Sequence, residues 1–136
     1  MYSKQFIIRI KFIIPFALFF GLKLSAQNYN FSNYSLKEGL PQSQVKVIYQ
    51  AKNRTLWLGT FGGVSNFDGK EFTSYSKANG LISNSIRSIV EDNQNQIYLG
   101  TEAGINIMKE GKISTLLKSP EVYALNKDKK GTIWGV

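Results

Sequence analysis

The stretch "EGLPQSQVKVIYQAKNRTLWLGTFGGVSNF", residues 38–67, decides the fold because the chain repeats it. The second copy, "NGLISNSIRSIVEDNQNQIYLGTEAGINIM", occupies residues 79–108 at an offset of 41 without a gap. A partial third copy follows at the shorter offset of 36, so that Trp134 aligns with Tyr98 of the second copy. A fixed period near 40 residues is typical of repeat architectures.

Each copy has the composition of short β-strands separated by polar turns. "QVKVIYQ" is rich in β-branched residues, and "TLWLGT" and "QIYLGT" place β-formers on both sides of an aromatic residue. A glycine turn follows in each copy, and then come two further strands, "VSNF" and "EFTSYS" in the first copy, joined by Asp68-Gly69. Four short antiparallel strands in about 40 residues predict one blade of a β-propeller.

We therefore predict an all-β chain, an incomplete β-propeller of about two and a half four-stranded antiparallel blades preceded by a signal-peptide helix. The predicted domains are a signal peptide at residues 1–26 and a partial propeller at 27–136. The blade repeats are expected at about 38–78, 79–118 and a truncated 119–136. No helix is predicted beyond the signal. A small β-sandwich would also have short strands and tight turns, but it does not explain the gapless self-match.

The first 26 residues have the order of basic, apolar and small residues that is typical of a secretory signal peptide. Three basic residues precede "FIIPFALFFGL" at 12–22, which carries no charge, and the small residues Ser25 and Ala26 follow. This order predicts export to the periplasm, with cleavage after Ala26. The alternative is an uncleaved membrane anchor, but a spanning helix needs about 20 apolar residues, whereas this run is shorter and ends at Lys23.

The composition excludes several kinds of chemistry. There is no cysteine or histidine, so a disulfide framework, a thiol nucleophile and a histidine phosphoacceptor are all absent from the sequence. The net charge of +8 is concentrated in part in the predicted signal, and the other positive charges are scattered singly except for "KDKK" at 127–130. This distribution argues against nucleic-acid binding.

The recurring aromatic position could bind a ligand or pack one blade on the next. Because the position is aromatic in every copy, we favour packing. The recurring glycines are expected to serve turns and close approach of sheets. These structural repeat positions are Trp57, Gly59, Gly63, Tyr98, Gly100, Gly104 and Trp134.

The carboxylates offer no clear catalytic arrangement. The candidates are Asp68, Glu91, Asp92 and Asp128. Asp92 and Asp128 share one repeat position, where the first copy has Ala51. All four candidates lie beside predicted turns, where aspartate bonds to the nearby backbone. We therefore predict no catalytic, cofactor-binding or metal-binding residue in this chain.

The copies resemble the two-component regulator propeller repeat, which reads roughly Leu-Pro, Val, a short strand, Asp-x-x-Gly, Leu-Trp-Leu-Gly-Thr and a Gly-Leu turn. The first copy matches at Leu40, Pro41, Val45, Leu56, Trp57, Leu58, Gly59, Thr60 and Gly63. The second matches at Leu81, Asn84, Ser85, Ile86, Asp92, Leu99, Gly100, Thr101 and Gly104, and the third at Val122, Asp128, Gly131, Ile133 and Trp134. The first copy lacks the Asp and Gly of its first turn.

The resemblance implies a function in signalling. Such blades form exported propellers that are followed by a three-Y immunoglobulin-like domain, a membrane helix and usually a histidine kinase. It implies that this chain is the N-terminal part of a ligand-sensing receptor domain, not an enzyme, without cofactors. The expected partners are an unknown ligand, often a carbohydrate such as an oligosaccharide, and downstream blades. Membrane contact would come only from a downstream helix or an uncleaved signal. The alternative is the N-terminal part of an exported propeller lyase or glycosidase, with its catalytic residues in other blades.

Overall fold

The computed structural model describes residues 30–136 of the chain, and Asn33–Val136 form one unit. The preceding residues 30–32 contain no helix or strand. The predicted signal peptide, residues 1–26, lies outside the described residues. Within the described part of the chain, no helix has the length and apolar character needed to span a bilayer.

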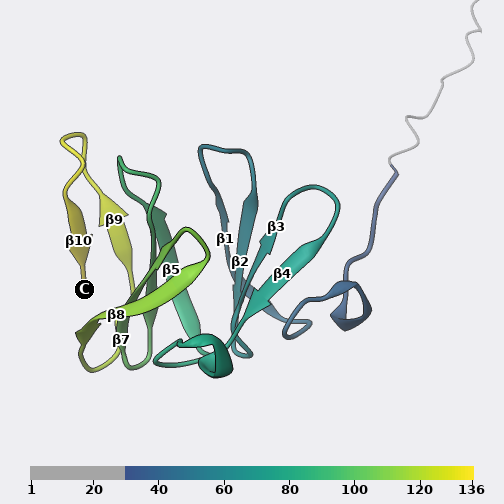
Figure 1. The fold of residues 1–136 in the computed structure, drawn as a ribbon, viewed down its shortest axis with the longest axis horizontal. Helices are drawn as coiled ribbons and strands as arrows, with labels where there is room; N and C mark the ends of the chain where they lie inside the picture. Colours follow the sequence, from purple (N-terminus) through teal and green to yellow (C-terminus); the bar gives the residue numbers. More distant parts are fainter. Residues whose placement is uncertain (1–29) are drawn as a thin grey trace, which may run out of the picture. The chain divides into compact units, whose positions relative to one another are not determined.

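In residues 30–136 the strands form two four-stranded sheets and one two-stranded sheet, all antiparallel (Figure 1). The first sheet contains β1 (Val45–Gln50), β2 (Leu56–Thr60), β3 (Val64–Phe67) and β4 (Phe72–Tyr75), hydrogen-bonded in that order. The second contains β5 (Ile86–Glu91), β6 (Ile97–Thr101), β7 (Gly104–Lys109) and β8 (Lys112–Lys118), and the third β9 (Leu125–Lys127) and β10 (Ile133–Gly135). This arrangement confirms the predicted all-β fold of about two and a half blades.

The prediction of no helix after the signal is wrong in detail. One-turn 3-10 helices occur at η1 (Leu36–Glu38) and η2 (Lys77–Asn79). Each begins at a serine in a capping box, and each ends at a glycine with positive φ, 108° at Gly39 and 104° at Gly80. The local sequences "SLKEGL" and "SKANGL" are therefore part of the repeat, and the two turns lead into the first two sheets.

A buried polar side chain holds the loop before the second sheet. Asn106 of β7 is 0% exposed, and its Oδ1 accepts a hydrogen bond from the Ile82 backbone N–H at 3.0 Å. Its Nδ2 donates to the carbonyl oxygens of Gly80 at 3.4 Å and Ser114 at 3.2 Å, and to Thr115 Oγ1 at 3.3 Å. Buried polar groups of the loop are thereby paired, as burial requires.

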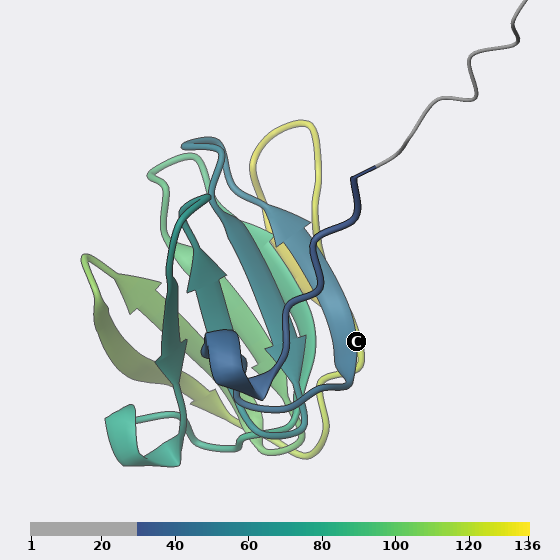
Figure 2. The same cartoon turned by 90° about the vertical axis from the view of Figure 1, so that its right-hand side faces the viewer.

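The hydrophobic core lies between successive sheets, which stand one beside the next in Figure 1 and overlap in the turned view of Figure 2. Between the first and second sheets, the largest cluster joins Trp57 and Val64 to Ile86, Leu99 and other apolar residues. A smaller cluster between the second and third sheets consists of Val90, Val122 and Leu125, with Tyr98, Ile105 and Ile133 packed against it. Packing of apolar sheet faces on each other is the interaction that joins neighbouring repeats.

Candidate functional site: the interface between the first two sheets

Trp57 lies in the interface between the first two sheets. Its side chain is 7% exposed and belongs to the same apolar cluster as Ile97 and Met108 of the second sheet. Its ring stacks with that of Tyr75 of β4, with 6.3 Å between the ring centroids and 23° between the planes. Trp57 therefore has the surroundings of a packing residue, although one side of the interface opens into a pocket that it lines.

The aligned aromatic residues of the other copies have different surroundings. Tyr98 is half-buried against Val122 and Leu125 of the third repeat. Burial, and then the charge and hydrogen bonding of the Asp92 carboxylate, raise the pKa of its phenol. Trp134 is instead 63% exposed, and its indole Nε1 donates to Asp128 Oδ2 at 3.2 Å. In the described residues only the first two of these rings are packed into an interface between sheets.

Gly59 and Gly100 occupy one repeat position and allow the next repeat to approach closely. A Cβ at Gly59 would lie 2.6 Å from Val47 Cγ1 and 2.7 Å from Ile86 Cγ2 of the second sheet. A Cβ at Gly100 would collide with Ser88 Oγ and lie 3.1 Å from Val122 Cγ1 of the third repeat. No side chain fits at these positions without displacing a neighbour.

Gly63 and Gly104 serve the following turn. Their φ angles are 137° and 129°, in the region that favours glycine, and a Cβ would meet the carbonyl oxygens of Tyr75 and Leu117. The threonine that ends each "LGT" motif closes the same turn, since Thr60 Oγ1 donates to the Gly63 carbonyl at 2.9 Å. Gly59 and Gly100 thus act by leaving space for the next repeat, and Gly63 and Gly104 by their backbone conformation.

Three of the four candidate carboxylates bind the backbone of their own turns. Asp92 Oδ1 accepts from the N–H groups of Gln94 and Gln96 at 2.8 Å each. Asp128 Oδ1 accepts from Lys130 and Thr132, and Asp68 Oδ1 from Lys70 and Glu71. The Trp134 indole, followed by the Thr132 N–H, lowers the pKa of Asp128, and the Glu71 N–H, followed by that of Lys70, lowers the pKa of Asp68. These aspartates therefore stabilise turns.

Glu91, at the end of β5, is the exception. Its side chain is 2% exposed, and Oε2 accepts from the backbone N–H of Lys52 in the first sheet's β1–β2 turn at 2.8 Å. Among residues 30–136, no lysine or arginine nitrogen lies within the 4.0 Å that defines an ion pair with this carboxylate. The Lys52 Nζ donates instead to the Asp92 backbone carbonyl at 2.8 Å and to Asn95 Oδ1 at 3.4 Å.

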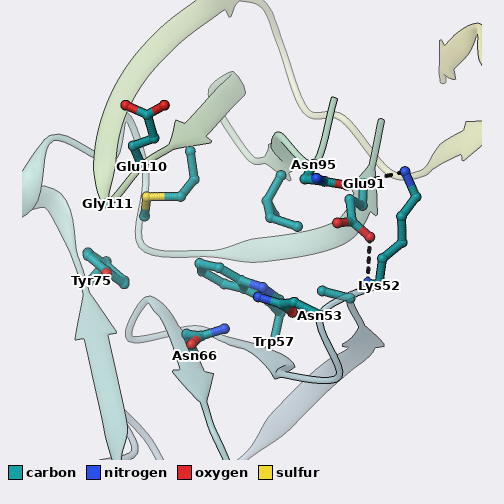
Figure 3. Close-up of a pocket in the computed structure, with 12 residues that line it drawn as sticks. Lys52, Asn53, Trp57, Asn66, Tyr75, Glu91, Asn95, Glu110 and Gly111 are labelled. Carbon is teal, nitrogen blue, oxygen red and sulfur yellow. Dashed lines mark hydrogen bonds between the residues drawn. The ribbon is translucent and has the colours of Figure 1, made fainter. Parts of the chain in front are cut away.

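Glu91 faces a pocket of about 560 Å³ between the first two sheets (Figure 3). Trp57 lies below the Glu91 carboxylate in this view, and Tyr75 stands at the opposite side. The β7–β8 hairpin contributes Glu110 and Gly111 at another edge. Polar and aromatic residues that line the pocket include Asn53, Trp57, Asn66, Tyr75, Glu91 and Glu110.

The repeated sequence pattern does not predict this pocket, because the pattern contains only what the copies share. The pocket residues are positions at which the copies differ. Glu91 aligns with Gln50 and Lys127, Asn66 with Ile107, and Tyr75, by strand register, with Leu117. The usable signal was polar or aromatic character confined to one copy. Within the part of the chain that the structure describes, no three His, Cys, Asp or Glu side chains are grouped so as to hold a metal.

Comparison with known proteins supports the repeat assignment. The family model for the two component regulator propeller matches twice, at residues 39–62 and 80–103. No protein with a curated description matches this chain. Among solved structures, the extracellular domain of a hybrid two-component system from B. thetaiotaomicron is similar, with a TM-score of 0.67 and 24% sequence identity.

The aligned region covers 81% of this chain but only 17% of that solved chain. At this identity the likeness establishes the fold, whereas the two family-model matches identify the repeats. The matched segments coincide with the glycine loop, the first strand and the "LGT" strand of each complete sheet. The chain therefore carries two segments that match the two-component regulator propeller repeat, and each matched segment supplies the first two strands of a four-stranded antiparallel sheet.

Proposed function

We propose that this chain is part of the extracytoplasmic ligand-sensing propeller of a two-component signalling receptor, and that the ligand is a carbohydrate. The observation that carries the proposal is the double match to the regulator propeller repeat. The similar structure, described as the extracellular domain of a hybrid two-component system, supports the same assignment. In this proposal the chain binds and does not catalyse, and a histidine kinase elsewhere in the receptor supplies the output.

The proposal places the protein in the periplasm, directed there by the first 26 residues. The natural-length protein, meaning the whole protein that the natural gene encodes, is expressed in a Gram-negative bacterium. Cell fractionation and N-terminal sequencing then test this step. Mature protein beginning at Gln27 in the extracytoplasmic fraction supports it. An intact N-terminus on cytoplasmic protein contradicts it.

Ligand binding is tested on the purified natural-length protein with a panel of oligosaccharides by isothermal titration calorimetry. Saturable binding of one oligosaccharide class without its chemical change is the expected result. Release of shortened or unsaturated sugars would support the alternative of a propeller glycosidase or lyase. Absence of binding across the panel would refute the carbohydrate assignment.

A further inference from the structure

We infer that the pocket between the first two sheets binds the ammonium group of a small amine-bearing ligand. The inference concerns the chemistry of this pocket and does not depend on the proposed signalling function. It rests on the buried carboxylate of Glu91, which has one hydrogen-bond donor and no ion pair in the described residues, and on the two aromatic rings that line the same space, with the exposed Glu110 at its edge.

The charge of the pocket is opposite to that of the chain. The chain carries a formal net charge of +8, but the charged residues that line the pocket are Glu91, Glu110 and Lys52. The Lys52 ammonium is bound to the Asp92 carbonyl and the Asn95 side chain, and Figure 3 shows it at the edge of the pocket. Glu91 is therefore the buried charge of the pocket, the exposed Glu110 lies at its edge, and a cationic group is the complementary ligand.

The burial of Glu91 is the strongest single observation. A buried carboxylate is costly unless a cation or several hydrogen-bond donors compensate it. Glu91 is only 2% exposed, and among the described residues its carboxylate has one hydrogen-bond donor, the Lys52 N–H, and no ion pair. In the aligned positions the repeat has Gln50 and Lys127, so the blade fold does not require a carboxylate here. A ligand ammonium at Glu91 would supply the missing cation.

Aromatic and amide side chains also line the pocket. Trp57 and Tyr75 present rings to the pocket, and an ammonium group near such a face is attracted by the π electrons. Asn66 Nδ2 is held by Thr55 Oγ1 at 2.9 Å, and Asn53 Oδ1 accepts from Thr55. Each amide keeps a second polar end with which to bind a hydroxyl. Both an amino sugar and a simple alkylamine carry the required ammonium group.

The test is calorimetric titration of the natural-length protein at low ionic strength with three probes. Glucosamine carries an ammonium on a sugar, n-butylamine carries it without a sugar, and N-acetylglucosamine has the sugar without the charge. Tighter binding of glucosamine than of N-acetylglucosamine, by at least about tenfold, is expected from a charge-assisted hydrogen bond. Binding of n-butylamine would identify a general amine site, and its exclusion an amino-sugar site. Equal affinity for the charged and neutral sugars, or no binding of either amine, overturns the inference.

Substitutions locate the site. Glu91→Gln keeps the shape and the acceptor for the Lys52 N–H but removes the charge, so glucosamine binding should weaken by at least about tenfold. Glu110 is exposed, so Glu110→Gln should leave the fold intact, and it should also lower the affinity for glucosamine. Glu71→Gln on the exposed β3–β4 hairpin is the matched control and should leave the affinity unchanged.

If Glu91→Gln fails to fold, as judged by circular dichroism, Glu110→Gln and Tyr75→Leu decide the question. Unchanged glucosamine affinity in both of these variants refutes the site.

The outcomes also separate this inference from the proposed function. Binding of neutral oligosaccharides without amine binding refutes only the ammonium site, and amine binding without oligosaccharide binding refutes only the carbohydrate assignment.

Discussion

At the scale of single residues, Asn106 makes side-chain hydrogen bonds to several neighbouring segments, although no repeat motif marks its position. Its four hydrogen bonds hold the Gly80–Ile82 loop against β7 and β8 from a fully buried position. At the aligned position of the first copy, Ser65 Oγ shares one hydrogen bond with Ser74 Oγ at 2.6 Å. The two copies thus have side chains at this position that differ in the number of hydrogen bonds they make.

Asn106→Ala should lower the free energy of unfolding by about 1–3 kcal/mol, because buried loop groups lose their partners. Ser65→Ala is the matched control and should cost less, since one hydroxyl bond is lost. Urea unfolding of the natural-length protein, followed by far-UV circular dichroism, measures both. Equal costs would show that the Asn106 hydrogen bonds do not hold the loop.

Arg54 has a left-handed backbone, with φ of 70°, at the fourth position of the first β1–β2 turn. The same position holds Asn95 in the second copy and Gly131, with φ of 91°, in the third. A left-handed conformation costs most L-residues roughly 1–2 kcal/mol, and glycine avoids this cost. Arg54→Gly should therefore raise the melting temperature, and the reciprocal change Gly131→Arg should lower it. A lower melting temperature for Arg54→Gly would contradict this explanation.

At the scale of elements, the close approach of β2 to β5 depends on Gly59. The two nearest atoms to a new Cβ belong to Val47 of the same sheet and Ile86 of the next. Gly59→Ala should therefore destabilise the protein by about 1–3 kcal/mol through overpacking. Thr73→Ala, on the exposed side of β4, is the control and should change stability little. Similar stability of both variants in chemical denaturation would mean that the sheets can separate without cost.

The strands could be predicted from sequence because the evidence for each one was present twice. The 41-residue offset brought "TLWLGT" onto "QIYLGT", and both became the second strand of a sheet. The 3-10 turns were missed although "SLKEG" and "SKANG" also repeat, because a single turn leaves no apolar periodicity. The pocket was missed for the opposite reason. Glu91, Asn66 and Tyr75 do not recur, and only the folded chain brings them together.

At the scale of the whole molecule, the third repeat exposes several large apolar side chains. Tyr123, Trp134 and Val136 are 62%, 63% and 78% exposed, whereas the aligned aromatic Trp57 is 7% exposed between two sheets. In the described residues β10 pairs with β9 and with no other strand. Exposed apolar side chains beside a strand edge favour association with another chain.

We therefore expect residues 27–136, expressed alone, to self-associate or aggregate instead of forming a monomer that unfolds in one transition. Repeats draw much of their stability from interfaces with neighbours, and here the first and third repeats each have one described neighbour. Size-exclusion chromatography and thermal unfolding by circular dichroism, at several protein concentrations, measure this. The control is the same segment with Trp134→Ser, which removes the largest exposed ring and should reduce association. A concentration-independent monomer with a sharp melt would mean that two and a half blades suffice for a stable domain.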